Sequence, residues 1–150
     1  MFVDITGVRH DVLFAAAVKR GFIKGISVTF TLAKIVVPVY VLITFLKHTP
    51  AIGYIADLFE PAMRLVGLPG EASIAIVLGY LTNLYAAIGA IASLNLSSKE
   101  TTIIALMLLI SHAMPMETAV SQKVGVNGIA MLAIRTILSI LAGAFLNIVL

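Results

Sequence analysis

The chain has 150 residues, of which 61% are hydrophobic and 11% are charged, and its mean hydropathy is +1.12. Soluble domains are typically about 45–50% apolar and about 25% charged, so this composition excludes an ordinary soluble protein and predicts an all-α integral membrane protein of one domain. The net charge of +3 comes from basic residues spread along the chain, which argues against nucleic acid as a partner, and the absence of cysteine excludes disulfides.

Residues 1–25 predict an amphipathic helix that lies on the membrane surface. Apolar residues recur there at helical spacing, while basic side chains such as Arg9 and Lys19 form a polar face. Residues 26–46 follow as the first spanning segment, because a helix needs roughly 20 apolar residues to cross a bilayer. We therefore expect a surface helix over residues 1–25 and a transmembrane unit over residues 26–150.

A second surface helix is predicted after the first span. Thr49 is expected as its N-cap, because a threonine hydroxyl can accept a hydrogen bond from a free backbone N–H of the first turn. Pro50 is expected as its first residue, because the N–H that proline lacks would have no partner at that position. Pro61 is expected to kink this helix. Gly67 suits its C-terminal cap, and Pro69 prevents its continuation.

The run from residue 72 to residue 96 carries no charge but is polar in its middle, at residues 82–85. As one straight helix it would reach roughly 37 Å at about 1.5 Å per residue, which exceeds a hydrocarbon core of about 30 Å. A tilted helix and a re-entrant pair of half-helices both fit. We favour the pair, because an Asn83 amide facing lipid is costly.

Two further membrane segments follow. Ser97 and Glu100 form a capping box at the start of the first one, and Pro115 is expected to break it. Residues 101–116 are too short for a full span. Residues 126–150 are long enough to span despite Arg135, which makes about four membrane segments in all.

A proline followed two residues later by a glutamate occurs twice beside an apolar segment, at Pro69–Glu71 and at Pro115–Glu117. A carboxylate at membrane depth costs about 2.5–3.5 kcal/mol, and proline removes a backbone donor. Broken helices that expose backbone and charge at mid-depth are how many transporters build binding sites. The predicted helix breaks therefore involve Pro69, Gly70 and Pro115.

Solute or ion binding is expected at Glu71 and Glu117. For Glu71 the alternative is a surface residue that gains about 0.3–1 kcal/mol from a helix dipole without any function. Glu117 has the stronger case, because the apolar run before it is too short to carry it to water on the far side of the membrane. Ser73, Asn83 and Thr118 are expected to donate or accept hydrogen bonds with the solute, although Asn83 would serve equally in helix-to-helix bonding.

His112 is a candidate proton or ion relay, with a hydrogen bond between helices as the alternative. Five residues and a proline separate it from Glu117, so helical geometry is not expected to bring these two side chains together. Lys34 and Arg135 should each pair with a carboxylate or extend to the interface, and the sequence does not choose their partners. No metal site and no enzyme motif is predicted.

Three stretches together resemble the nucleoside-recognition or "gate" membrane family. They are Gly67-Leu68-Pro69-Gly70-Glu71-Ala72-Ser73, the segment from Thr82 to Gly89 (TNLYAAIG), and the segment from Leu109 to Ala119 (LISHAMPMETA). The family includes the small spore maturation proteins A and B and related bacterial inner-membrane proteins. It is similar, more distantly, to the membrane part of ferrous iron transporters and to concentrative nucleoside transporters. The lack of cysteine argues against a ferrous role.

This resemblance implies a multi-pass protein of the inner (cytoplasmic) membrane that forms half of a transporter. In larger relatives two such units in inverted orientation hold the substrate between them. The expected function is movement of a small polar solute, with a nucleoside-like molecule as the candidate, with no cofactor and with Na⁺ or H⁺ as candidate coupling ion. The expected partners are the lipid bilayer, the solute, and a second copy in an antiparallel homodimer or a sister gate protein in a heterodimer. The alternative is a non-transporting membrane scaffold or assembly factor of the spore-maturation type.

Overall fold

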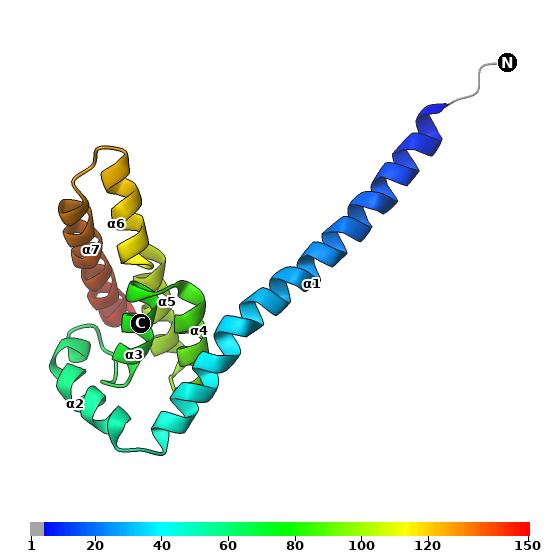
Figure 1. Ribbon diagram of the computed structural model, residues 1–150. Coiled ribbons are helices and arrows are strands. Elements are labelled where there is room, and N and C mark those ends of the chain that lie inside the picture. The colour runs from blue at the N-terminus through cyan, green and yellow to red at the C-terminus, as the bar shows by residue number, and fades with distance from the viewer. Residues whose placement is uncertain (1–4) are drawn as a thin grey trace. The chain divides into compact units, whose positions relative to one another are not determined.

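The computed structural model describes residues 5–150, with side chains from residue 14 onward, and this part of the chain is entirely helical apart from its connections. The chain divides into two units, one ending at Lys34 and the other covering residues 35–150. Seven helices follow one another along the described residues (Figure 1): α1 (Ile5–Lys47), α2 (Ala51–Arg64), α3 (Ala72–Leu81), α4 (Leu84–Ser93), α5 (Ser98–Ile110), α6 (Met114–Lys123) and α7 (Gly128–Val149).

Helix α1 is continuous across the point at which the sequence predicts a division near residue 25. Polar side chains in this stretch are satisfied within the helix, since Thr29 Oγ1 donates to the Gly25 carbonyl and Thr31 Oγ1 donates to the Ser27 carbonyl. No proline or capping residue interrupts the backbone there. The location of residues 1–25 on the membrane surface stays a prediction.

Helix α2 has the predicted amphipathic pattern and the predicted end. Gly67 has φ of +71°, its N–H donates to Arg64 O (3.1 Å), and the N–H of Leu68 donates to Met63 O (3.0 Å). These two bonds form a Schellman cap, which glycine favours because it lacks a Cβ. The N-terminus lies one residue later than predicted. Pro50 occupies the cap position, and the Thr49 hydroxyl accepts only from Ala51 N, at 3.4 Å.

Helices α3 and α4 form a hairpin of two short apolar helices that pack side by side (Figure 1). Asn83 caps α4 with its side chain, which accepts a hydrogen bond from Ala86 N at 3.0 Å. The prediction of two half-helices, rather than one tilted helix, is confirmed. Each half has 10 residues, or about 15 Å at about 1.5 Å per residue, which is half of a hydrocarbon core of about 30 Å.

Three helical segments of the described chain are long and apolar enough to cross a membrane: Phe14–Lys47, Ser98–Lys123 and Gly128–Val149. The second of these comprises α5 and α6 with the break between them. Together with the α3–α4 hairpin they account for the four membrane segments expected. Both hydrogen bonds of the predicted capping box at the start of α5 are present: Glu100 N donates to Ser97 Oγ, and Ser97 N donates to Glu100 Oε2.

Helix α7 packs against α5 through small residues. Ser139 and Gly143 are buried four residues apart on α7, and a Cβ added to Gly143 would lie 2.8 Å from the sulfur of Met107. Small residues allow helix backbones to approach closely, which is the usual basis of helix association in membranes. Lys99 Nζ of α5 donates to the Asn147 carbonyl (2.9 Å) near the end of α7, where a cation complements the helix dipole.

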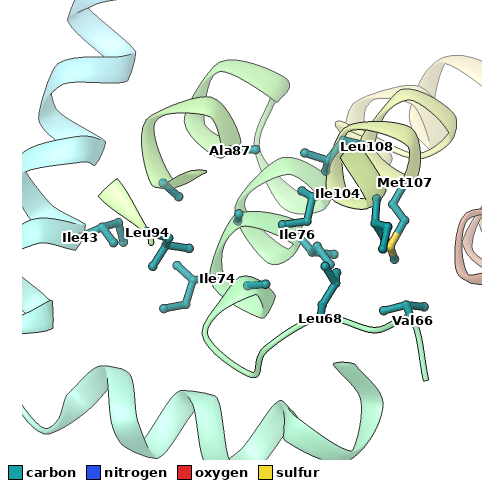
Figure 2. Close-up of a cluster of buried hydrophobic side chains, with 14 of the residues drawn as sticks. Ile43, Val66, Leu68, Ile74, Ile76, Ala87, Leu94, Ile104, Met107 and Leu108 are labelled. Carbon is teal, nitrogen blue, oxygen red and sulfur yellow. The ribbon is translucent and has the colours of Figure 1, made fainter. Parts of the chain in front are cut away.

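The core lies where α3, α5 and the connection after α2 meet. Figure 2 shows Ile104 and Leu108 of α5 beside Ile76 of α3, with Leu68 of the connection on the same cluster. All four side chains are less than 9% exposed. This core fixes α3 against α5, and therefore places the break at the end of α3 beside the break at the end of α5.

Candidate functional site

Two helix breaks meet inside the second unit. The first is at residues 82–83, between α3 and α4, and the second is at residues 111–113, between α5 and α6. The backbone N–H of Ala113 donates to the carbonyl oxygen of Gly79, at 2.9 Å, so the last turn of α3 is tied directly to the second break. This bond satisfies backbone groups that would otherwise be unpaired at membrane depth.

The second break has an unusual backbone. Ala113 adopts φ of +44° and ψ of +39°, a left-handed conformation that costs an L-residue roughly 1–2 kcal/mol. Ser111, two residues earlier, is fully buried, and its hydroxyl has no hydrogen-bond partner among the residues whose side chains are described. An unpaired buried hydroxyl is costly, typically by about 1–3 kcal/mol. Strain and an unpaired buried hydroxyl often occur together at functional sites, and this break is therefore the candidate site of the unit.

Three ionisable side chains gather beside this break. Glu117, in the first turn of α6, forms an ion pair through Oε2 with Nη1 of Arg135 on α7. The other carboxylate oxygen, Oε1, lies 3.5 Å from Nε2 of His112. Arg135 Nε also donates to the Ile110 carbonyl at the end of α5 (3.0 Å), so the guanidinium joins both helices that flank the break.

The cluster corrects one expectation from sequence spacing. A proline and five residues were expected to keep His112 away from Glu117, yet the structure brings them to 3.5 Å. The reason is that the chain does not continue as one helix: the left-handed turn at Ala113 ends α5 and starts α6, whose first turn presents Glu117 back toward His112. Pro115 is not itself in the break but lies in this first turn, where a missing N–H is tolerated.

The two Pro-x-Glu sequences lie apart in the structure, and the binding role predicted for each glutamate stays a prediction. Glu71 occupies the N-cap position of α3, without a side-chain capping bond, and no cation of residues 14–150 lies within ion-pair distance. Gly79, which touches the second break, is about 12 Å farther along α3 at about 1.5 Å per residue. Glu71 therefore lies at the opposite end of α3 from Glu117.

The remaining predicted residues are divided between these places. Ser73 is buried near the start of α3, and its hydroxyl has no partner among the side chains and backbone that the structure describes. It lines an apolar cavity of about 240 Å³ between α2 and α3. Asn83 uses its side-chain oxygen to cap α4 at the first break. Thr118 follows Glu117 on α6, and its methyl group faces Gly128 at the start of α7. Pro69 and Gly70 lie in the connection before α3, where Gly70 N donates to Glu60 Oε2 at 2.8 Å.

Arg135 is the member of the cluster that sequence reasoning left without an assignment. Its pairing with Glu117 was one of the alternatives kept open, and a charge within an apolar helix is the signal that a partner exists.

Four residues farther along the same helical face, the Ser139 hydroxyl pairs with the Tyr80 hydroxyl and donates to Met107 O (3.0 Å). This second polar group of α7 was missed, because serine and tyrosine in apolar helices carry no specific pattern.

Comparison with known proteins identifies the family. The family described as "Nucleoside recognition" (Gate) matches residues 29–148, which include both helix breaks and the whole ionisable cluster. The chain belongs to this family. The resemblance noted from its motifs is therefore confirmed. So is the assignment to the integral membrane proteins, since residues 14–150 contain three helical segments that could span a membrane.

Two relatives are informative. The "Uncharacterized membrane protein YvoD" of Bacillus subtilis is 41% identical over 129 residues, which are 86% of this chain but 41% of the relative. The "Inner membrane protein YjiG" of Escherichia coli K12 is 37% identical over 91 residues, 59% of this chain and 57% of the relative. This chain thus spans less than three fifths of either relative. The inner-membrane location expected for this multi-pass protein is that of the Escherichia coli relative. No solved structure matches the chain.

Proposed function

We propose that this gate-family chain is half of a membrane transporter, and that it moves a small polar solute along a pathway completed by a second unit. The observation that carries the proposal is the meeting of the two helix breaks beside the Glu117–Arg135–His112 cluster. Irregular backbone at membrane depth is tolerated where it is buried in protein or lines a polar cavity. Binding sites of secondary transporters are typically built from discontinuous helices of this kind.

The cluster has the chemistry that solute or ion coupling requires. The Glu117 side chain is 35% exposed and that of its partner Arg135 is 19% exposed. The pair is therefore partly buried but still accessible to a solute. Ser111 adds an unpaired hydroxyl in the same break. Glu117 thus serves as the group that binds the solute or a coupling ion, with Na⁺ and H⁺ as the candidate ions. Glu71 and Ser73, at the far end of α3, would belong to a different part of the pathway.

The size of the unit supports assembly with a second copy. The part of the Bacillus subtilis relative that matches this chain is less than half of that protein, which leaves room there for a second unit of similar size. One such unit encloses too little space to surround a solute. An antiparallel homodimer would supply the missing inverted repeat, and a sister gate protein in a heterodimer is the alternative arrangement.

Uptake into liposomes tests the transport function. The purified chain is reconstituted and supplied with labelled uridine, a neutral sugar, an amino acid and small organic anions, with and without Na⁺ and pH gradients. We expect uptake of at least one solute, and its loss in the Glu117→Gln variant. The matched control is Asp57→Asn, which neutralises an exposed carboxylate on the amphipathic helix α2 and should leave uptake unchanged. The variant Glu71→Gln shows whether the far end of α3 takes part.

Failure of the wild-type chain to move any of these solutes, with correct folding and insertion, would favour the non-transporting scaffold.

The orientation of the chain in the membrane is tested separately. The chain contains no cysteine, so cysteines introduced at positions 2 and 98 can be labelled from one side of intact cells. Labelling of both positions from both sides supports the antiparallel homodimer, whereas a single accessible side for each position excludes dual insertion.

A further inference from the structure

The charges and contacts of the Glu117–Arg135–His112 cluster support an inference about the charge of the solute. This inference rests on the proposed transport function and deepens it. We infer that the cluster takes up one proton together with one small monoanion, and that the anion binds the Arg135 guanidinium in the place that the Glu117 carboxylate occupies in this structure.

The charges around the cluster are few. Helix α7 contributes only Arg135. Helix α3, which also packs against α6, carries no charged residue, and its one titratable side chain, Tyr80, pairs with Ser139. The charged residues of α5 are Lys99 and Glu100 at its opposite end, and the other charge on α6 is Lys123 at its last position. With a neutral imidazole, the cluster therefore has a net charge of zero.

This neutrality makes the two binding events depend on each other. An anion bound alone would leave a net charge of −1 in a water-poor environment, and a proton bound alone would leave +1. Both together restore a net charge of zero. Because an uncompensated charge at membrane depth is strongly unfavourable, the two ligands are expected to enter and leave together.

The contacts of His112 indicate where the proton binds. Its Nδ1 lies 3.1 Å from the Leu108 carbonyl, and a carbonyl oxygen can only accept, so Nδ1 carries the hydrogen and donates. Nε2 of the neutral ring then presents a lone pair toward the Glu117 oxygen at 3.5 Å. A proton added between these two atoms converts that contact into a hydrogen bond. The protonated arrangement weakens the hold of Glu117 on Arg135.

The contacts of Arg135 indicate where the anion binds. The bond from Nε to the Ile110 carbonyl keeps the guanidinium at the break after the carboxylate has moved away. A guanidinium has five N–H donors in a planar fork, which matches the oxygens of a carboxylate, sulfonate or phosphate group. A neutral solute such as a nucleoside carries no negative charge that could replace the charge of the displaced Glu117 carboxylate.

Anion affinity as a function of pH tests this inference. The full-length chain in uncharged detergent is titrated with methanesulfonate, which stays a monoanion at all working pH values, and binding is read from the thermal shift. The buffer is zwitterionic and free of other small anions. Between about pH 8 and about pH 5.5 the affinity should rise by up to about tenfold per pH unit, as expected for one coupled proton.

Three variants separate the roles. Arg135→Gln should abolish anion binding at every pH. Glu117→Gln should bind the anion tightly and independently of pH, because its guanidinium is already free, yet it should fail to move the anion across liposomes. His112→Gln should bind with a reduced pH dependence. Arg64→Gln, which removes an exposed arginine of α2, is the matched control. Its anion affinity and the pH dependence of that affinity should equal those of the wild type, although loss of the Arg64–Glu60 pair should lower its melting temperature without anion.

Other outcomes overturn the inference in distinguishable ways. Uptake of uridine or a sugar without anion binding would retain the transport function and exclude the monoanion as its solute. A thermal shift produced by phosphatidylglycerol but not by methanesulfonate or inorganic phosphate would assign Arg135 to a lipid headgroup instead. Anion affinity that is equal at both pH values in the wild-type chain would exclude proton coupling.

Discussion

The backbone N–H of Ala113 donates to the carbonyl oxygen of Gly79, and this bond of 2.9 Å connects the break after α5 to the last turn of α3. Gly79 allows α3 to lie close to α5 here, because a Cβ at this position would overlap the Leu108 side chain. A displacement of α3 would therefore move the break that carries His112, and with it the environment of Glu117. This hydrogen bond joins the hairpin to the break that carries His112.

Substitution of Gly79 by alanine should destabilise the protein. The added Cβ would overlap a methyl group of Leu108 and lie 3.1 Å from Cβ of Ala87, and Leu108 is itself 1% exposed and cannot move freely. Overpacking of this kind costs about 1–3 kcal/mol. The free energy of unfolding, measured by denaturation from mixed micelles, should fall by this amount. Gly53→Ala is the control: an added Cβ there meets nothing within 4 Å, and helix stability should rise by about 0.5–1 kcal/mol. Equal effects of the two substitutions would contradict the packing.

Gly67→Ala and Gly125→Ala should differ in cost although both glycines have positive φ. An L-residue in this region loses about 1–2 kcal/mol, which should be the full effect at Gly125, where a Cβ meets nothing within 4 Å. At Gly67 the same Cβ would overlap the Asn147 side chain, so about 1 kcal/mol more should be lost. Unfolding measurements on both variants test the contact between the α2 cap and α7. Equal losses would mean that Asn147 moves aside freely.

The ion pair of Glu117 and Arg135 should appear as a coupling energy in a double-mutant cycle. Glu117→Gln and Arg135→Gln each leave a shielded charge without its partner, and each should lower the free energy of unfolding by about 1–3 kcal/mol. The double variant should lose less than the sum of the two, because no unpaired charge remains. Additive losses would show that the pair does not form in the folded protein.

The junction of α2 and α3 should respond to acid through Glu60. Its Oε1 accepts from Arg64 Nε (2.9 Å) and its Oε2 from Gly70 N (2.8 Å), and the Arg64 hydrogen bond is the main reason that the pKa of Glu60 is lowered from its ordinary value of 4.5. A carboxyl group with a lowered folded-state pKa stabilises the fold above its unfolded-state pKa. That stabilisation is lost as the pH falls through the folded-state value.

Glu60→Gln should therefore reduce the melting temperature at neutral pH and flatten the decline of stability below about pH 4.5. Melting curves in detergent from neutral to acidic pH provide the measurement. Asp57→Asn is the control, because Asp57 is an exposed carboxylate on the same helix with no ion pair among residues 14–150, and the acid-dependent decline should remain. An unchanged decline in the Glu60 variant would contradict the role assigned to this junction.

Local signals in the sequence were reliable where one or two residues decide the backbone. Gly67 ends α2 as predicted, the Ser97–Glu100 box starts α5, and the polar residues around Asn83 divide the uncharged run into two half-helices. In each case the deciding interaction joins residues that are close in sequence. The sequence predicted that a second helix break exists but not where it lies. The break is at residues 111–113 and not at Pro115.

The sequence by itself determined that this is an all-helical membrane protein of the gate family with two interrupted segments, because hydrophobic length, charge sparsity and capping chemistry are local properties of the chain. Only the tertiary structure decided which charges meet. The packing of α7 against α5 and α6 places Arg135 on Glu117, and the turn at Ala113 brings His112 to the same carboxylate. The length of α3 keeps Glu71 away. These contacts join residues whose distances depend on how helices pack, and no spacing along the chain encodes them.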